Sequence, residues 1–239
     1  IKAAGFKLLL DFHYSDTWAA PAKQWTPAAW AGLDDSQLAA KLKAYTAEVL
    51  TKMKQNGTEP DLIQTGNEIS YGMLWGENAA TARYCYPSSP QENWNRFTQL
   101  LHAATAACRE ICPKAKIILH TERVPTTQQR DNTNYQALLN FYQQMQLAKV
   151  DYDIIGLSYY PYFHGPMSEL NATISRLETS FSGKDIMLVE TGYPYKWPVG
   201  GSTFDYTAQY PYSLQGQQHF TAALITMLKT HKRVTGLFW

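Results

Sequence analysis

Short apolar segments alternate with helix-forming segments along this sequence, and that alternation limits the folds open to the chain. Between neighbouring apolar segments, hydrophobic residues recur with the three- and four-residue spacing of an amphipathic helix. A strict alternation of strands and helices is typical of a parallel sheet whose strands are joined by right-handed crossover connections. The six predicted strands cover residues 7–13, 62–68, 116–122, 154–160, 185–190 and 234–239.

The length of the chain fits a single α/β domain over residues 1–239. With 239 residues and a hydrophobic fraction of 45%, the chain can build one large domain around a sizeable core. Local signals mark a helix in this α/β pattern: Asp34 and Gln37 have the spacing of a capping box at its start, and Asn56-Gly57 marks its end. We expect a (β/α)8 TIM barrel that is incomplete in this sequence. Eight strands would close such a barrel, and both ends of the sequence interrupt the repeat, so we expect a piece of a longer chain.

Charge and composition exclude several kinds of partner. Lysine plus arginine number 21 and aspartate plus glutamate 20, giving a formal net charge of +1. No basic run could follow a phosphate backbone, so we predict no nucleic-acid partner. No stretch reaches the ~18 consecutive apolar residues of a membrane-spanning helix, so we predict none.

The three cysteines do not form a recognisable metal or disulfide pattern. Cys85, Cys108 and Cys112 lack the paired spacing of a zinc site and are too few for a disulfide scaffold. We predict buried, reduced thiols, while a disulfide from Cys85 to either of the others remains an alternative. We predict neither a metal nor a cofactor.

Two predicted strands end in a glutamate. The segment 62–68 ends in Asn67-Glu68, and the segment 185–190 ends in Glu190 before a Thr-Gly-Tyr-Pro turn. The carboxyl ends of parallel strands meet at one rim, which is where barrel enzymes keep their chemistry. The sequence therefore predicts paired carboxylates at this rim, although structural salt bridges would also explain isolated glutamates.

Paired carboxylates and abundant aromatic residues are typical of glycoside hydrolysis. A retaining glycosidase uses one carboxyl group as acid and base and a second as nucleophile, held roughly 5–5.5 Å apart. Asn67 suits such a site because a side-chain amide can bind a sugar 2-hydroxyl. Aromatic residues make up 13% of the chain and gather near predicted strand ends and loops, where sugar rings could stack, although ordinary core packing would explain about half of them.

Five ordered motifs run across nearly the whole chain, at residues 9–24, 66–68, 158–165, 190–194 and 210–217. Together they resemble glycoside hydrolase family 53, the arabinogalactan endo-β-1,4-galactanases. The resemblance implies a clan A barrel of which this chain holds strands three to eight. It also implies cleavage of β-1,4-linked galactan with retention, with Glu68 as acid/base and Glu190 as nucleophile.

Further positions are candidates for substrate binding. Asp11 and His13 end the first predicted strand and are expected near the scissile bond, with a histidine satisfied inside the core as the alternative. His120, near the end of the third strand, could bond a sugar hydroxyl. Because strand residues alternate between faces, only one of Tyr159 and Tyr160 can orient the nucleophile.

Tryptophans are the remaining candidates for sugar contacts. Trp18 belongs to the longest of the motifs, and Trp239 resembles the eighth-strand tryptophan that floors the subsite of the cleaved sugar. Trp75 and Trp197 could stack on more distant galactose units, with loop packing as the alternative.

The resemblance also implies a partner and a place of action. We expect galactan or arabinogalactan as the partner of a monomer that is secreted, periplasmic or on the cell surface. Because the first two barrel strands are absent, we expect the 239 residues alone to have little activity. The alternatives are another retaining clan A glycanase, acting on β-glucan, mannan or xylan, and a non-catalytic carbohydrate-binding barrel.

Overall fold

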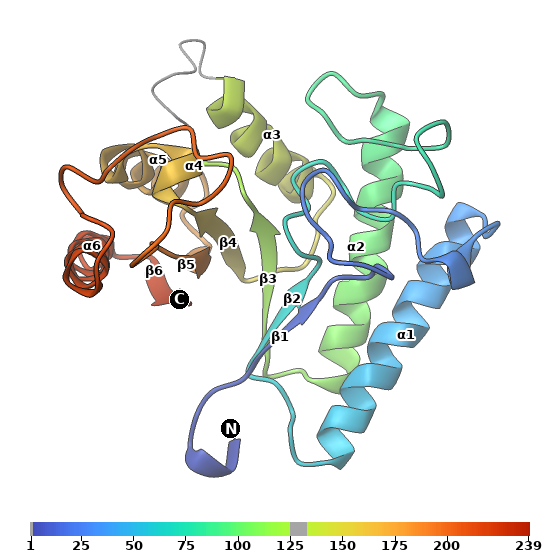
Figure 1. Ribbon diagram of the computed structural model, residues 1–239. Helices are drawn as coiled ribbons and strands as arrows, with labels where there is room; N and C mark the ends of the chain where they lie inside the picture. The colour runs from blue at the N-terminus through green and yellow to red at the C-terminus, as the bar shows by residue number, and fades with distance from the viewer. Residues whose placement is uncertain (1, 125–132) are drawn as a thin grey trace. The chain divides into compact units, whose positions relative to one another are not determined.

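The computed structural model describes residues 2–124 and 133–239, in which strands and helices alternate as the sequence predicts (Figure 1). The chain divides into two compact units. The first unit comprises Ile1–Thr121 and Asn140–Ile154, and the second comprises Glu122–Leu139 and Ile155–Trp239. The expectation of a single domain over residues 1–239 stays a prediction.

The first unit is a parallel sheet covered by two long helices. Its strands pair in parallel in the order β1-β2-β3, and helices α1 and α2 pack along each other, with α2 also contacting β2 (Figure 1). A short 3-10 helix, η1 (Lys2–Ala4), precedes the sheet, and another, η2 (Ala28–Trp30), precedes α1. The main elements are β1 (Leu9–Phe12), α1 (Asp35–Gln55), β2 (Leu62–Thr65), α2 (Gln91–Ile111) and β3 (Lys116–Thr121).

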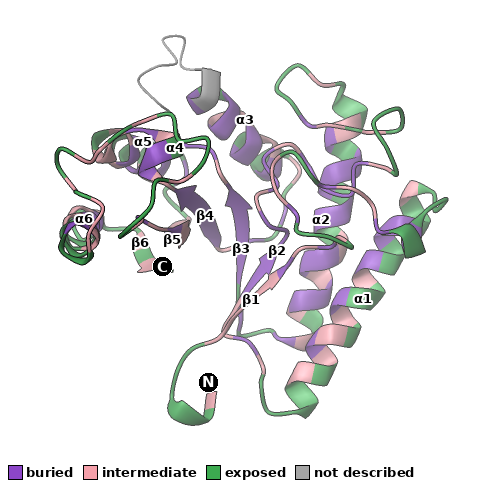
Figure 2. Ribbon diagram, in the orientation of Figure 1, coloured by how far each residue is buried: buried purple, intermediate pink, exposed green. Residues whose placement is uncertain are grey.

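The second unit is likewise built from strands of the parallel sheet that alternate with helices. Its strands follow the order β4-β5-β6, and β5 pairs in parallel with β6. Every residue of β4 is buried, as expected for a strand of a parallel sheet (Figure 2). Helix α3 (Thr133–Leu147) contributes residues to both units. The other elements are β4 (Ile154–Tyr159), α4 (Pro161–His164), α5 (Met167–Ser180), β5 (Asp185–Thr191), α6 (Leu214–Leu228) and β6 (Val234–Leu237).

Helix α1 begins at the capping box that the sequence predicts. The carboxylate of Asp34 accepts the backbone N–H of Gln37 at 2.8 Å, and the side chain of Gln37 accepts the N–H of Asp34 at 3.1 Å. These bonds satisfy two of the N–H groups that a helix leaves unpaired at its start. Leu42 and Leu50 on the inner face of the helix are fully buried.

The strand that precedes the first glutamate is shorter than predicted. Residues 62–68 were expected to be extended, but β2 ends at Thr65, and Glu68 lies three residues beyond it. The cause is local, because Gly66 adopts φ +109° and Glu68 adopts φ +49°, neither of which continues a strand. Similarly, β6 ends at Leu237 instead of residue 239.

All three cysteines are free and buried, which confirms the prediction of buried thiols over a disulfide. Burial raises the pKa of Cys85 to about 12 and that of Cys112 to about 11. The thiolate forms that could react are therefore suppressed near neutral pH.

An ion-pair cluster anchors the start of α1 to α2 and to the loop that follows Glu68. The carboxylate of Asp35 accepts hydrogen bonds from Arg83 Nη1 at 2.8 Å and from Arg96 Nε at 2.9 Å. Arg96 also donates from Nη2 to the carbonyl of Leu74 at 2.7 Å, and its side chain is only 5% exposed. Partial burial raises the pKa of Asp35, but the hydrogen bonds from the two arginines outweigh it and hold that pKa below its usual value.

We expect Asp35→Ala to lower the free energy of unfolding by about 2–3 kcal/mol at neutral pH, because it leaves the buried guanidinium of Arg96 without its carboxylate. A carboxylate with a depressed pKa contributes stability that is present above its unfolded pKa and is lost as the pH falls through the folded pKa. The difference between wild type and variant should therefore be constant from about pH 5 to pH 8 and shrink below the ordinary value of 3.8. Urea titrations at several pH values measure it, and a difference that does not change with pH would contradict the role of the charge.

Candidate functional site

The turn after β2 holds Glu68 in a left-handed conformation. Its φ of +49° is uncommon for a residue with a side chain and costs roughly 1–2 kcal/mol. Gly66 precedes it at φ +109°, and a Cβ there would lie 2.6 Å from Ile69 Cγ2. The turn therefore needs a glycine two residues before the glutamate and depends on the surrounding structure to hold its shape.

Asn67 and His120 lie next to each other inside the first unit. Asn67 is 1% exposed, and its amide donates to the carbonyl of Ala19 at 2.9 Å. His120, in β3, is fully buried, and its Nδ1 accepts the backbone N–H of Glu68 at 3.2 Å. Burial, reinforced by the nearby His13, lowers the pKa of His120 to about 3. The neutral ring therefore carries its proton on Nε2, because Nδ1 is the acceptor.

These contacts show that Asn67 and His120, both predicted to bind sugar, also make hydrogen bonds within the protein. Asn67 directs its side-chain N–H to a protein carbonyl, and Asn67 Oδ1 lies 3.1 Å from the Nδ1 of His120 and 3.4 Å from the Nε2 of Gln64. Both residues support the turn that carries Glu68, whatever further contacts they make. Binding of a 2-hydroxyl by Asn67 and of a sugar hydroxyl by His120 stays a prediction.

Gln24 is a residue of this site that sequence reasoning missed. It lies in the loop after β1, is 2% exposed, and donates from Nε2 to the carbonyl of Asn67 at 2.7 Å and to that of Glu68 at 3.3 Å. Only its position in the first motif could have pointed to it, since a glutamine in a loop carries no signal of its own.

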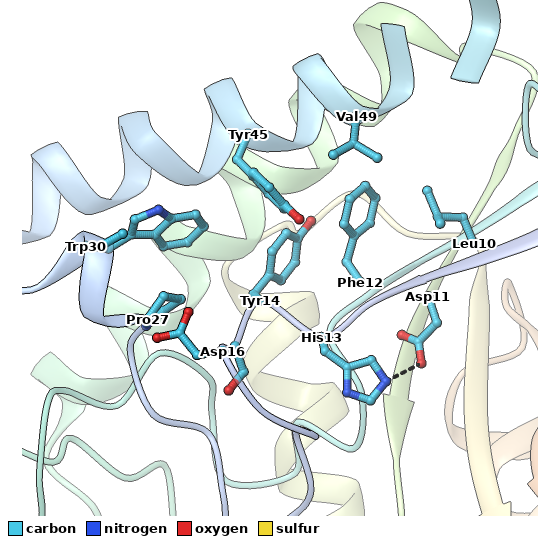
Figure 3. A pocket seen from close by; sticks show the side chains of 12 residues that line it. Leu10, Asp11, Phe12, His13, Tyr14, Asp16, Pro27, Trp30, Tyr45 and Val49 are labelled. Carbon is cyan, nitrogen blue, oxygen red and sulfur yellow. Dashed lines mark ion pairs between the residues drawn. The ribbon is translucent and has the colours of Figure 1, made fainter. Parts of the chain in front are cut away.

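Asp11 and His13 form a pair at the end of β1. His13 Nε2 lies 3.3 Å from Asp11 Oδ2, and His13 Nδ1 accepts the backbone N–H of Ala19 at 3.0 Å (Figure 3). The backbone carbonyl of Ala19, in turn, accepts a hydrogen bond from the side-chain amide of Asn67. His13 and Asn67 thus both bond the main chain of Ala19, while the place of Asp11 and His13 near the scissile bond stays a prediction.

The cavity in Figure 3 lies beside this pair and against α1. It encloses about 330 Å³, and Glu68 is not among its lining residues. The rings of Phe12 and Tyr14 stack 5.0 Å apart on the α1 side, and Tyr14 shares a hydrogen bond with Thr46 at 2.9 Å. The cavity therefore lies among β1, the loop that follows it and α1, and Asp11 and His13 are among its lining residues.

Glu190 lies in β5 of the second unit, as predicted. The hydroxyl of Tyr160 donates to Glu190 Oε2 at 3.1 Å. The preceding tyrosine, Tyr159, is fully buried and donates instead to the carbonyl of Gly165 at 3.1 Å. Of the two tyrosines, Tyr160 is therefore the one whose hydroxyl reaches Glu190, and its role in orienting the nucleophile stays a prediction.

A histidine also fixes the backbone of Tyr160. The short helix α4, which sequence reasoning did not predict, turns the chain so that His164 Nδ1 accepts the N–H of Tyr160 at 3.0 Å. Burial lowers the pKa of His164 to about 4, which keeps this nitrogen an acceptor at neutral pH. In each unit, a neutral histidine therefore accepts a backbone N–H, that of Glu68 in the first unit and that of Tyr160, which bonds Glu190, in the second.

The four candidate tryptophans differ in exposure. Trp18 and Trp197 are 75% and 69% exposed, and Lys196 Nζ lies 4.6 Å from the centre of the Trp197 ring. The ring of Trp239, the last residue of the sequence, lies 6.3 Å from that of Phe220. Trp75 is 2% exposed and donates from its indole N–H to the carbonyl of Tyr71 at 2.8 Å. The structure therefore favours loop packing, the alternative, for Trp75.

Neither a metal cluster nor a membrane span occurs in the part of the chain that the structure describes. Among residues 2–124 and 133–239, no three His, Cys, Asp or Glu side chains are grouped so that they could hold a metal ion. The helices within these ranges are all too short or too polar to cross a bilayer.

Comparison with solved structures defines the fold class of the whole chain. The GH53 catalytic domain of Ignisphaera aggregans matches 99% of this chain and 63% of its own with a TM-score of 0.82 at 33% identity. A fungal β-1,4-galactanase matches with a TM-score of 0.80 at 32% identity, over 99% of this chain and 68% of its own. The fold is thus part of a (β/α)8 barrel of the glycosidase type. The family model "Glycosyl hydrolase family 53" matches residues 1–239, and the chain belongs to that family.

Curated relatives extend the comparison. The arabinogalactan endo-β-1,4-galactanase of Thermothelomyces thermophilus is 32% identical over all of this chain and 68% of its own length. That of Cellvibrio japonicus is 34% identical over all of this chain and 62% of its own length. The chain therefore spans about two thirds of the length of these relatives.

Proposed function

We propose that the protein carrying this chain is a retaining endo-hydrolase of β-1,4-galactosidic bonds in galactan or type I arabinogalactan. The observation that carries the proposal is the family match over the whole chain, together with galactanases among the relatives at 30% identity or more. The two glutamates that the sequence analysis singled out supply the residues for the chemistry.

In this proposal Glu190 attacks the anomeric carbon while Glu68 protonates the departing oxygen. The resulting galactosyl ester on Glu190 is then hydrolysed by a water molecule that Glu68 deprotonates, and two inversions give net retention. The hydroxyl of Tyr160 supports the nucleophile, because its donated hydrogen bond favours the ionised carboxylate. Exposed Trp18, Trp197 and Trp239 are the proposed platforms for sugar rings.

A polymer of galactose cannot cross a membrane intact, so the proposed place of action is outside the cytoplasm. Galactan is the proposed partner, and the monomeric state stays a prediction.

Product analysis tests the proposal against the other glycanase activities. We expect protein expressed from its complete gene to release galacto-oligosaccharides from galactan at least ~10²-fold faster than it releases products from cellulose, mannan or xylan. Proton NMR of the first products should show the β-anomer, as retention requires. Comparable rates on mannan or xylan, or an α-anomer formed first, would overturn the proposal. Tight galactan binding without any release would favour the non-catalytic alternative.

A further inference from the structure

We propose that Gln24 is a positioning residue that holds the acid/base Glu68 in its active conformation. The inference rests on the proposed function, because it assigns a role in delivering the proton of Glu68. Gln24 would not contact the substrate. It would act through the backbone of the turn after β2.

The side chain of Gln24 reaches two consecutive carbonyls. Its amide nitrogen lies 2.7 Å from the carbonyl oxygen of Asn67 and 3.3 Å from that of Glu68. Gln24 is 2% exposed, so neither bond competes with bulk water. A side-chain amide has two N–H groups, and this pair of acceptors matches both of them.

The main chain of Gln24 is also fixed. Its carbonyl accepts the backbone N–H of Trp75 at 2.9 Å, and Trp75 is itself buried at 2% exposure. The main chain of Gln24 is therefore bonded to a buried residue, which restricts how far its side chain could follow a shift of the turn. This restriction is what a positioning residue requires.

The turn is held from its other side by His120. The Nδ1 of His120 accepts the N–H of Glu68, while Gln24 donates to the carbonyl of the same residue. The backbone polar groups on both sides of the Glu68 Cα are thus bonded to buried side chains. A residue at φ +49° relaxes readily to negative φ unless such contacts oppose it, and that relaxation would redirect its carboxyl group.

The consequence for catalysis is specific to proton transfer. A misplacement of about 1 Å can cost on the order of 10²-fold in rate when a group must meet a reacting atom. Losing the two bonds from Gln24 should therefore impair bond cleavage only where the leaving group needs a proton from Glu68.

The test compares two substrates in Gln24→Met, which keeps the size of the side chain and removes both donors. For galactan oligosaccharides, whose leaving oxygen must be protonated, we expect kcat/KM to fall roughly 10- to 100-fold. For a 2,4-dinitrophenyl β-galactobioside, whose leaving group needs no proton, kcat/KM should change less than about threefold. Activity on the second substrate also reports that the variant is folded.

A double-variant cycle with Glu68→Gln separates a positioning role from a general structural one. If Gln24 acts through Glu68, the double variant should lose no more activity on oligosaccharides than Glu68→Gln alone. If Gln24 merely stabilises the fold, the two losses should multiply and should affect both substrates equally. That second result would overturn the inference.

Asn93→Leu is a matched control. Asn93 donates from its side-chain amide to the carbonyl of Tyr84, a bond of the same type in the same unit, and among the described residues it makes no hydrogen bond to the Glu68 turn. It should leave the ratio of kcat/KM between the two substrates unchanged. If Glu68→Gln itself has no effect on oligosaccharides, the proposed function fails; if it has an effect and Gln24→Met has none, only the inference fails.

Discussion

Replacing Glu190 by alanine is expected to lower galactan hydrolysis by roughly 10⁴-fold or more, because the attack on the anomeric carbon loses its nucleophile. The loss should appear in kcat/KM for galactan oligosaccharides and equally for an activated aryl galactobioside, since both must form the bond to this residue. Glu92→Ala is a suitable control, because Glu92 is an exposed glutamate at the start of α2. Activity close to wild type in Glu190→Ala would refute the nucleophile assignment.

Added azide should identify the role of Glu190 from the stereochemistry of the product. In Glu190→Ala the anion can enter the space left by the carboxylate and attack from the face opposite the leaving group. The product from an activated β-galactoside is then the α-galactosyl azide. A β-galactosyl azide from this variant would assign Glu190 to the acid/base role instead.

The change Glu68→Gln is expected to lower kcat/KM for galactan oligosaccharides by roughly 10²- to 10⁴-fold, the range attributable to a general acid. The expected loss on a dinitrophenyl galactobioside is small for kcat/KM, because dinitrophenolate departs without a proton. Its kcat should still fall, since the galactosyl ester on Glu190 lacks a base to activate water.

Azide gives the complementary product in this variant. The anion should attack the α-linked ester on Glu190 from the β face, restore kcat on the activated substrate and yield β-galactosyl azide. Steady-state kinetics with product NMR measures both effects. Equal losses of kcat/KM on the two substrates would show that Glu68 does not act as the proton donor.

The elements of this fold follow from local sequence patterns. The alternation of apolar runs with amphipathic segments predicts every strand and the long helices, because each pattern reflects burial of one face. The capping box at Asp34 and Gln37 was also predictable, since both bonds form between residues three apart. The glutamates Glu68 and Glu190 were found because each lies at or shortly after the end of a short strand-forming segment.

Other features of the fold and the site depend on contacts between distant residues, and local sequence patterns do not predict them. The short helix α4 and the early end of β2 follow from local backbone conformations, and the spacing of hydrophobic residues in the sequence does not predict them. Gln24 supports a residue 44 positions away, and its role is invisible without the turn it meets. Trp75 is buried against Trp25, from a different loop, and Tyr84, although its position after a strand suggested a surface for sugar.

The hydrogen bonds at Glu68 also set an order of events during synthesis. Gln24 is made before the glutamate, but His120, which accepts its N–H, lies 52 residues further along the chain. Because chains emerge from the ribosome N-terminus first, the segment from Gln24 to Glu68 must wait for β3 before the turn can reach its final form. A nascent chain that ends before residue 120 therefore lacks the acceptor that the N–H of Glu68 has in the folded protein.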